Sequence, residues 1–92
     1  MTLFTVDEKI SMVTTEYGVV MLDMKSGAYF ELNQSGALVL DVLVNGGDVA
    51  HATQRLTAEY DIDEETARQD AAEILADLVS AGILRERAEG TR

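Results

Sequence analysis

The spacing of apolar residues changes at Asn33, and this change constrains the fold more than any other feature of the chain. Before it, the segment from Ile10 to Leu32 holds short runs of alternating or β-branched residues, which favour strands. After it, apolar residues recur every three or four positions, which is helical spacing. The sequence therefore predicts an α+β fold in which an antiparallel sheet is followed by helices.

Three strands are expected in the first half, joined by two short turns that each end in glycine. Because short turns join antiparallel neighbours, these strands should form a three-stranded meander. Its strands are predicted at residues 10–15, 19–24 and 28–32.

Alternation assigns each strand residue to one face of this sheet. In the third strand, charge places Glu31 in solvent with Tyr29, so Phe30 and Leu32 should face the core. In the second strand the same rule places Asp23 in solvent. It thereby predicts Val19 and Met21 on the outer face, and Val20 and Leu22 in the core.

Three helices are expected after Asn33, which is a good N-cap residue. The first should end at Gly46, the second should begin after Asp48, and the third should begin after Asp63 and end at Gly82. The order of strands and helices resembles a winged helix with its sheet placed first. Ile83 and Leu84 should then fold back on the core.

The third helix carries an acidic stripe beside its apolar face. At 100° per residue the apolar side chains from Ala67 to Val79 share one arc, and Asp70, Glu73 and Asp77 follow one edge of it. The third strand is an edge of the meander and carries no Lys or Pro, which commonly protect such edges. If this helix lies beside that strand, the two form a groove with an apolar floor and an acidic rim, which could accept an extended peptide.

Composition excludes several kinds of site. The 92 residues include no Cys and a single histidine, His51, so neither a thiolate metal site nor a multi-histidine site can form. No nucleophile–base pair, glycine-rich phosphate loop or calcium loop is visible, so we expect no catalytic residues, no metal and no cofactor. The net charge of −10 disfavours nucleic acid and favours a basic partner.

The length fits one domain, with an ordered core over residues 10–85, a loose arm over residues 1–9 and a frayed tail from residue 86 to residue 92. No apolar run is long enough to span a membrane, and no signal peptide is visible at the N-terminus. A cytoplasmic location is therefore expected, without contact with membranes.

An ordered set of short motifs resembles the PqqD-like family. The set begins with Gly27-Ala28-Tyr29-Phe30-Glu31-Leu32-Asn33 and continues with Ser35-Gly36-Ala37 and Gly46-Gly47-Asp48. It ends with Tyr60 and Ala81-Gly82-Ile83-Leu84. The apolar run from Leu40 to Val44 also belongs to the set, and the resemblance as a whole covers residues 10–85.

The resemblance implies a winged-helix-like domain of three strands and three helices. Such domains recognise the leader of a ribosomally made, modified peptide, which binds as an extra strand against the third strand, beside the third helix. They then present the precursor to a processing enzyme. Standalone members serve lasso-peptide pathways, where the partner is a leader peptidase, and radical-SAM pathways. The lasso type is favoured here, with a basic leader.

The resemblance also implies which residues contact the leader. The strand should offer backbone hydrogen bonds, and Ile74 and Leu78, with Val20 or Leu22 below them, should form pockets. The acids of the stripe should pair with basic side chains. The full set of expected contacts is Ala28, Tyr29, Phe30, Glu31, Leu32, Asp70, Glu73, Ile74, Asp77 and Leu78.

Four other functions fit less well. A DNA-binding winged helix would need a basic recognition helix, but residues 63–81 hold one Arg and six acids. An acyl carrier would need a serine in a Gly-Asp-Ser-Leu-like setting, and an enzyme would need a catalytic cluster. The main alternative is a protein-interaction or dimerisation module that uses the outer sheet face.

Overall fold

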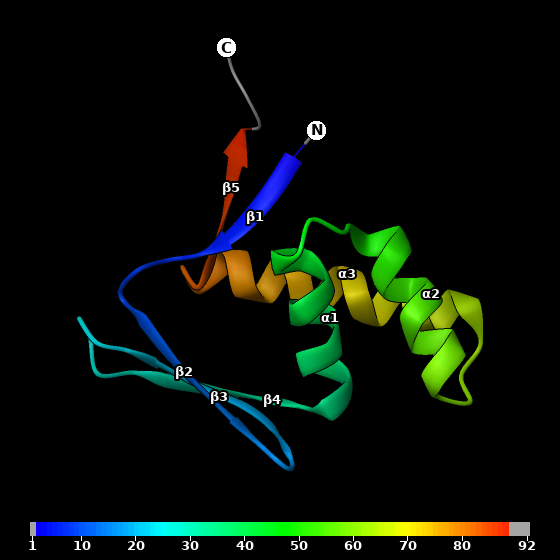
Figure 1. Ribbon diagram of the computed structural model, residues 1–92, viewed down its shortest axis with the longest axis horizontal. Coiled ribbons are helices and arrows are strands. Elements are labelled where there is room, and N and C mark those ends of the chain that lie inside the picture. The colour runs from blue at the N-terminus through cyan, green and yellow to red at the C-terminus, as the bar shows by residue number, and fades with distance from the viewer. Residues whose placement is uncertain (1, 89–92) are drawn as a thin grey trace.

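The computed structural model describes residues 2–88 and has the predicted α+β architecture. Three helices lie together, with a three-stranded sheet on one side and a two-stranded ribbon on another (Figure 1). None of the helices in this range is long and apolar enough to cross a membrane. The elements, in chain order, are β1 (Thr2–Val6), β2 (Ile10–Thr15), β3 (Gly18–Asp23), β4 (Tyr29–Asn33), α1 (Gln34–Val44), α2 (Val49–Glu59), α3 (Glu64–Ser80) and β5 (Leu84–Ala88).

The predicted meander is confirmed as the antiparallel sheet β2-β3-β4. The β3–β4 connection is a short loop closed by Gly27, whose φ is 81°. Gly18 begins β3 with a φ of 146°, and a side chain there would collide with the carbonyl oxygen of Leu32. The close approach of β3 to β4 at this point therefore requires glycine.

The face assignment predicted for the second strand is wrong. Met21 is completely buried and pairs with Phe30, while Leu22 pairs with Tyr29 and is 40% exposed. The cause is Asp23, which is buried rather than exposed. Its carboxylate accepts hydrogen bonds from the backbone N–H groups of Lys25 and Ser26, so it caps the hairpin loop from inside the fold. Val19 and Met21 accordingly face the core, and Val20 and Leu22 face away from it.

The expectation of a loose N-terminal arm is also wrong. Residues 2–6 form β1, which pairs antiparallel with β5, from Thr2 opposite Ala88 to Val6 opposite Leu84. The expected tail is shorter for the same reason, because residues 86–88 belong to β5, and residues 89–92 lie outside the described range. The two strands are far apart in the sequence, so neither has a local signal for its partner.

The predicted helix boundaries are confirmed, because they depend on local capping. The side chains of Asn33, Asp48 and Asp63 accept hydrogen bonds from backbone N–H groups in the first turns of α1, α2 and α3. At the other ends, Gly46 and Gly82 have positive φ after α1 and α3. These caps fix where each helix begins and ends.

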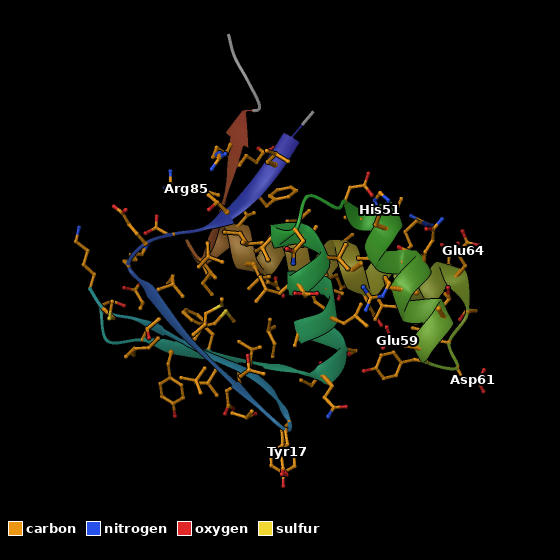
Figure 2. All side chains as sticks on the ribbon, viewed as in Figure 1. Tyr17, His51, Glu59, Asp61, Glu64 and Arg85 are labelled. Atoms are coloured by element: carbon orange, nitrogen blue, oxygen red, sulfur yellow. The ribbon has the colours of Figure 1, made fainter. Side chains whose placement is uncertain are left out.

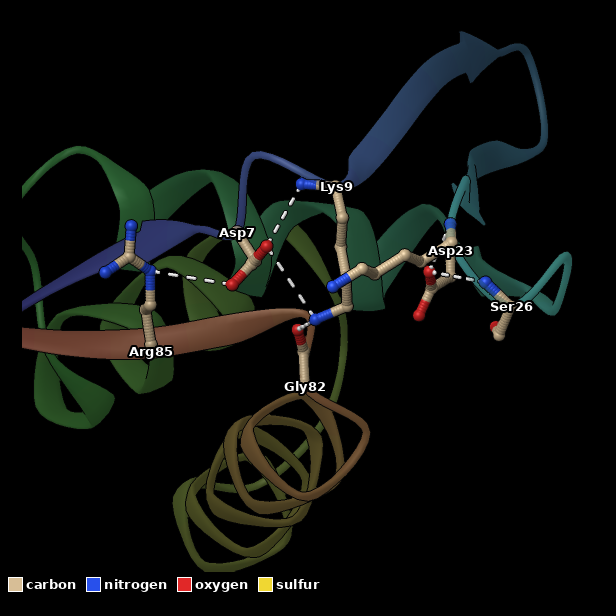
Figure 3. Close-up of polar contacts among 7 residues, drawn as sticks. Asp7, Lys9, Asp23, Ser26, Gly82 and Arg85 are labelled. Carbon is tan, nitrogen blue, oxygen red and sulfur yellow. Dashed lines mark hydrogen bonds and ion pairs between the residues drawn. The ribbon is translucent and has the colours of Figure 1, made fainter.

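The core gathers apolar side chains from the helices, β3 and β5, as expected for Ile83 and Leu84. Its largest fully buried members are Met21, Leu43, Leu56, Ile83, Leu84 and Val39. A polar junction at its edge joins the two sheets (Figure 3). There Asp7 lies 3.7 Å from both Lys9 and Arg85, and Lys9 Nζ donates to the carbonyl oxygen of Gly82. The junction fixes the path of the chain from the ribbon into β2.

Candidate functional site

Within the part of the chain that the structure describes, strand β4 lies at the edge of its sheet and has unpaired backbone groups. The N–H of Asp23 donates to the carbonyl oxygen of Ala28, which sets the hydrogen-bonding phase of the β3–β4 ladder. Because partners in an antiparallel ladder alternate, Phe30 and Leu32 bond to β3, whereas the N–H and C=O groups of Tyr29 and Glu31 point away from it. A further strand could therefore pair with β4 through these two residues.

A groove of about 510 Å³ lies at the C-terminal end of this edge. It runs from the β2–β3 turn and the start of α1 to the end of α2 and the middle of α3. Five apolar or aromatic residues line it, namely Tyr17, Leu56, Tyr60, Ile62 and Ile74. Its polar lining consists of Asn33, Gln34, Ser35 and Asp70. The groove is thus an apolar trough with one carboxylate at its rim.

Hydrogen bonds hold the wall of the groove that surrounds Tyr17. The Nε2 of Gln34 donates to the carbonyl oxygen of Glu16 at 2.6 Å, which ties the β2–β3 turn to the first residue of α1. The N–H of Tyr17 donates to Thr15 Oγ1 at 3.1 Å. Tyr17 itself is 79% exposed and projects from the tip of the hairpin (Figure 2). Its ring is therefore available to a ligand although its backbone is fixed.

The structure brings only some of the predicted contact residues together. Asp70 and Ile74 line the groove, while Glu73 and Asp77 are exposed on α3 outside its lining. Leu78 is 3% exposed and belongs to the core. Val20 and Leu22 cannot lie below Ile74, because they face away from the core.

The predicted strand residues divide by face. Ala28 precedes β4, Tyr29 and Glu31 are exposed, and Phe30 and Leu32 are half-buried toward the core. Phe30 and Leu32 pack against the core cluster. The strand thus offers its backbone at the edge and two side chains on the outer face.

Three prominent members of the groove were not among the predicted contact residues, namely Tyr17, Tyr60 and Ile62. All three lie next to glycine or aspartate in short loops, where neither strand nor helix periodicity assigns a direction. An aromatic residue at the tip of an otherwise polar hairpin was the one available signal.

The outer face of the three-stranded sheet is apolar and uncovered within the described residues. Its exposed members include Val13 at 60%, Leu22 at 40% and Tyr29 at 67%. No part of residues 2–88 covers this face, because the helices pack on the other one. Exposed apolar surface of this kind typically marks a contact with another molecule.

Acidic and histidine side chains form no group of three or more within residues 2–88 that could hold a metal ion. His51 is exposed, and its Nδ1 lies 3.1 Å from Asp48 Oδ1 at the start of α2. The side chain of Asp48 also accepts the N–H of His51. This pair is accounted for by helix capping.

Residues 18–84, more than half of the chain, match the family model described as PqqD, coenzyme PQQ synthesis protein D. The chain belongs to the PqqD family. No curated protein matches it significantly.

Two solved structures resemble this PqqD-family protein along nearly their whole length. One is a lasso peptide synthetase B1 complexed with the leader peptide. It is 35% identical, with a TM-score of 0.81 over 89% of this chain and 96% of the other. The second is TbiB1 in complex with the TbiA(beta) leader peptide. It is 24% identical, with a TM-score of 0.77 over 91% of this chain and 98% of the other, and it supports the fold alone.

Proposed function

We propose that this PqqD-family protein captures the leader of a precursor peptide and presents it to a processing enzyme. The observation that carries the proposal is the free edge of β4 beside a groove of about 510 Å³. An extended peptide would add to the sheet through the outward N–H and C=O groups of Tyr29 and Glu31. The 35% identical lasso peptide synthetase B1, complexed with a leader peptide, supports this use of the fold.

The expected contacts follow from the placement of the residues. Residues 28–32 supply the strand edge, and half-buried Ile74 receives an apolar anchor of the leader. Leu78 acts from beneath, as part of the support for Ile74. Asp70, Glu73 and Asp77 attract basic side chains, and exposed ion pairs of this kind contribute about 0.2–1 kcal/mol each. Burial of apolar anchors must therefore supply most of the binding energy.

The role is recognition without catalysis, in a pathway of the lasso-peptide type, with a leader peptidase as the enzyme that receives the loaded precursor. The similarity to the lasso peptide synthetase B1 favours that pathway. No cofactor takes part. The net charge of −10 favours a leader that carries basic residues.

Fluorescence anisotropy tests leader capture directly. Labelled leader peptides from lasso and radical-SAM pathways are titrated with the protein, and saturable binding to one class is expected. Glu31→Pro removes an outward N–H from β4 without removing a bond to β3, so it should abolish binding. Thr14→Pro is the matched control at the opposite edge of the sheet. The N–H of Met24 donates to the carbonyl oxygen of Lys9, which sets the alternation of the β2–β3 ladder. By this alternation the N–H of Thr14 points away from β3.

Ile74→Lys should also abolish binding, because it places a charge in the apolar trough. Equal affinity of wild type, Glu31→Pro and Ile74→Lys, with all three shown to be folded, would exclude this groove as the leader site. Absence of binding to any leader would exclude leader capture itself.

A second candidate function is a protein-interaction or dimerisation module, favoured by the uncovered outer face that holds Val13, Leu22 and Tyr29. Analytical ultracentrifugation of the wild type and of a Leu22→Ser, Tyr29→Ser variant tests it. A dimer that the double substitution dissociates would support this role. A monomer at all concentrations would exclude self-association.

A further inference from the structure

The hairpin-tip end of the groove brings two tyrosines and a carboxylate into one cavity. Tyr17 borders it at the β2–β3 turn, with its ring projecting outward from the hairpin tip (Figure 2), and Tyr60 at the end of α2 and Asp70 on α3 complete the lining there. Aromatic faces and carboxylates both attract cations, and a ring attracts a cation that lies over its face. These three side chains therefore favour a cationic ligand group, whereas the apolar trough as a whole favours any apolar one.

The charge of the cavity is unbalanced. Asp70 is the one ionised residue among those that line it, and no Lys or Arg of the described residues does so. Within residues 2–88 the other exposed ion pairs on α2 and α3, Arg55–Glu59 and Arg68–Glu65, are formed along each helix. Asp70 has no such partner within that range. A ligand cation would therefore meet a carboxylate that no described side chain neutralises.

The floor of the cavity suits a long aliphatic stem. Leu56 is 2% exposed, and Ile62 and Ile74 are half-buried beside it. Lysine and arginine commonly lay their methylene groups on apolar surface and keep the charged head at the rim. Arginine fits better than lysine, because its planar guanidinium stacks on tyrosine rings and can bond to a carboxylate through two N–H groups.

We infer that Tyr17, Tyr60 and Asp70 form a subsite for one arginine side chain of the bound peptide. This inference rests on the proposed leader capture and names the chemistry that the leader must carry at one position. The methylene stem lies on Leu56 and Ile62, and the guanidinium lies at the rim beside Asp70, where it can stack on a tyrosine ring. Gln34 is a positioning residue, because its hydrogen bond to Glu16 holds the turn that carries Tyr17.

A selection from random peptides tests the subsite and requires no leader sequence. A randomised dodecapeptide library is displayed and selected on the immobilised full chain. We expect the enriched peptides to share one arginine within an otherwise extended, apolar motif. Selection on Asp70→Asn should lose that arginine. Selection on Glu64→Gln should keep it, because Glu64 is an exposed acid on the same helix but lies outside the lining.

The best enriched peptide is then synthesised with arginine or with neutral, nearly isosteric citrulline at the shared position. By anisotropy, citrulline should weaken binding to the wild type about three- to tenfold. Asp70→Asn should remove this difference. Tyr17→Leu and Gln34→Ala should reduce the arginine-to-citrulline ratio, whereas Tyr17→Phe should keep it, because the ring remains. A general loss of folding would weaken both peptides equally and leave the ratio unchanged.

Two outcomes overturn the inference in different ways. Enriched peptides with an aromatic or aliphatic residue at the shared position, or an arginine preference that Asp70→Asn leaves intact, would exclude the subsite while peptide capture stands. Failure of the folded wild type to enrich any peptide would exclude leader capture, and the subsite with it.

Discussion

Lys9 donates a hydrogen bond of 3.1 Å from its Nζ to the carbonyl oxygen of Gly82, and this bond joins the residue before β2 to the turn that follows α3. The ammonium lies where the unpaired carbonyl groups of the helix give a partial negative charge. The same side chain lies 3.7 Å from Asp7 (Figure 3). One residue thus connects the β1–β5 ribbon, the three-stranded sheet and the longest helix.

Lys9→Met should therefore lower the free energy of unfolding by about 1 kcal/mol, because it removes a charge at a helix C-terminus and a hydrogen bond to Gly82. Urea unfolding followed by circular dichroism measures the change. Lys25→Met is the control, since Lys25 is an exposed loop residue and forms no ion pair within residues 2–88. Equal effects of the two substitutions would show that the Lys9–Gly82 contact contributes nothing to stability.

Met21→Ala should destabilise the protein far more than Leu22→Ala. Met21 is completely buried, and truncation of a buried Met to Ala typically costs about 2–5 kcal/mol. Leu22 is 40% exposed on the outer face, so its truncation should cost less than about 1 kcal/mol. The two free energies, measured by urea unfolding, decide directly which face of β3 is buried. The reverse order would restore the assignment made from alternation.

Gly18→Ala should destabilise the sheet by at least about 2 kcal/mol. The φ of 146° is rarely adopted by residues with a side chain, and the added Cβ would also collide with the Leu32 carbonyl. Gly27→Ala is the matched control, because Gly27 has a φ of 81° but open space around its Cα. It should cost about 1 kcal/mol, from backbone conformation alone. Thermal unfolding of both variants separates the collision from the conformational term.

Stability should fall as the solution becomes acidic. The pKa of each of four aspartates lies below its ordinary value of 3.8. The causes are the N–H of Lys9 for Asp7, the N–H of His51 for Asp48 and the hydroxyl of Thr66 for Asp63. Burial raises the pKa of Asp23, but the N–H groups of Ser26 and Lys25 outweigh it.

A lowered pKa means that folding favours the ionised form. The resulting stabilisation is complete above the unfolded value near pH 4 and is lost as the pH falls through the lower folded value. The urea midpoint should therefore drop between about pH 4 and pH 2. Asp23→Asn should be less stable than the wild type at pH 7, with a smaller difference at about pH 2.5. A constant difference across this range would exclude ionisation of Asp23 as the cause.

The features predicted correctly from the sequence are those set by neighbouring residues. Asn33, Asp48 and Asp63 cap helices because each lies immediately before an apolar pattern of helical period, and no distant contact is needed. The edge position of β4 followed from the order of short turns. The acidic stripe was also predicted, although only Asp70 of its three members lines the groove.

The errors have three separate physical causes. Asp23 was assigned to solvent because it is charged, yet its carboxylate is satisfied by two backbone N–H groups of its own loop, and this inverted the assignment of the whole strand. The β1 strand was missed because its partner lies at the other end of the chain. Tyr17 and Tyr60 were missed as groove residues because loops, rather than periodic elements, orient them.

The pairing of β1 with β5 also imposes an order on folding. The first strand has no partner until translation has passed Leu84–Ala88, whereas the meander and the helices are formed by nearby segments. During synthesis, Leu3, Phe4 and Val6 remain exposed while the rest of the chain acquires its structure. The β1–β5 ribbon is therefore expected to close after the meander and the helices.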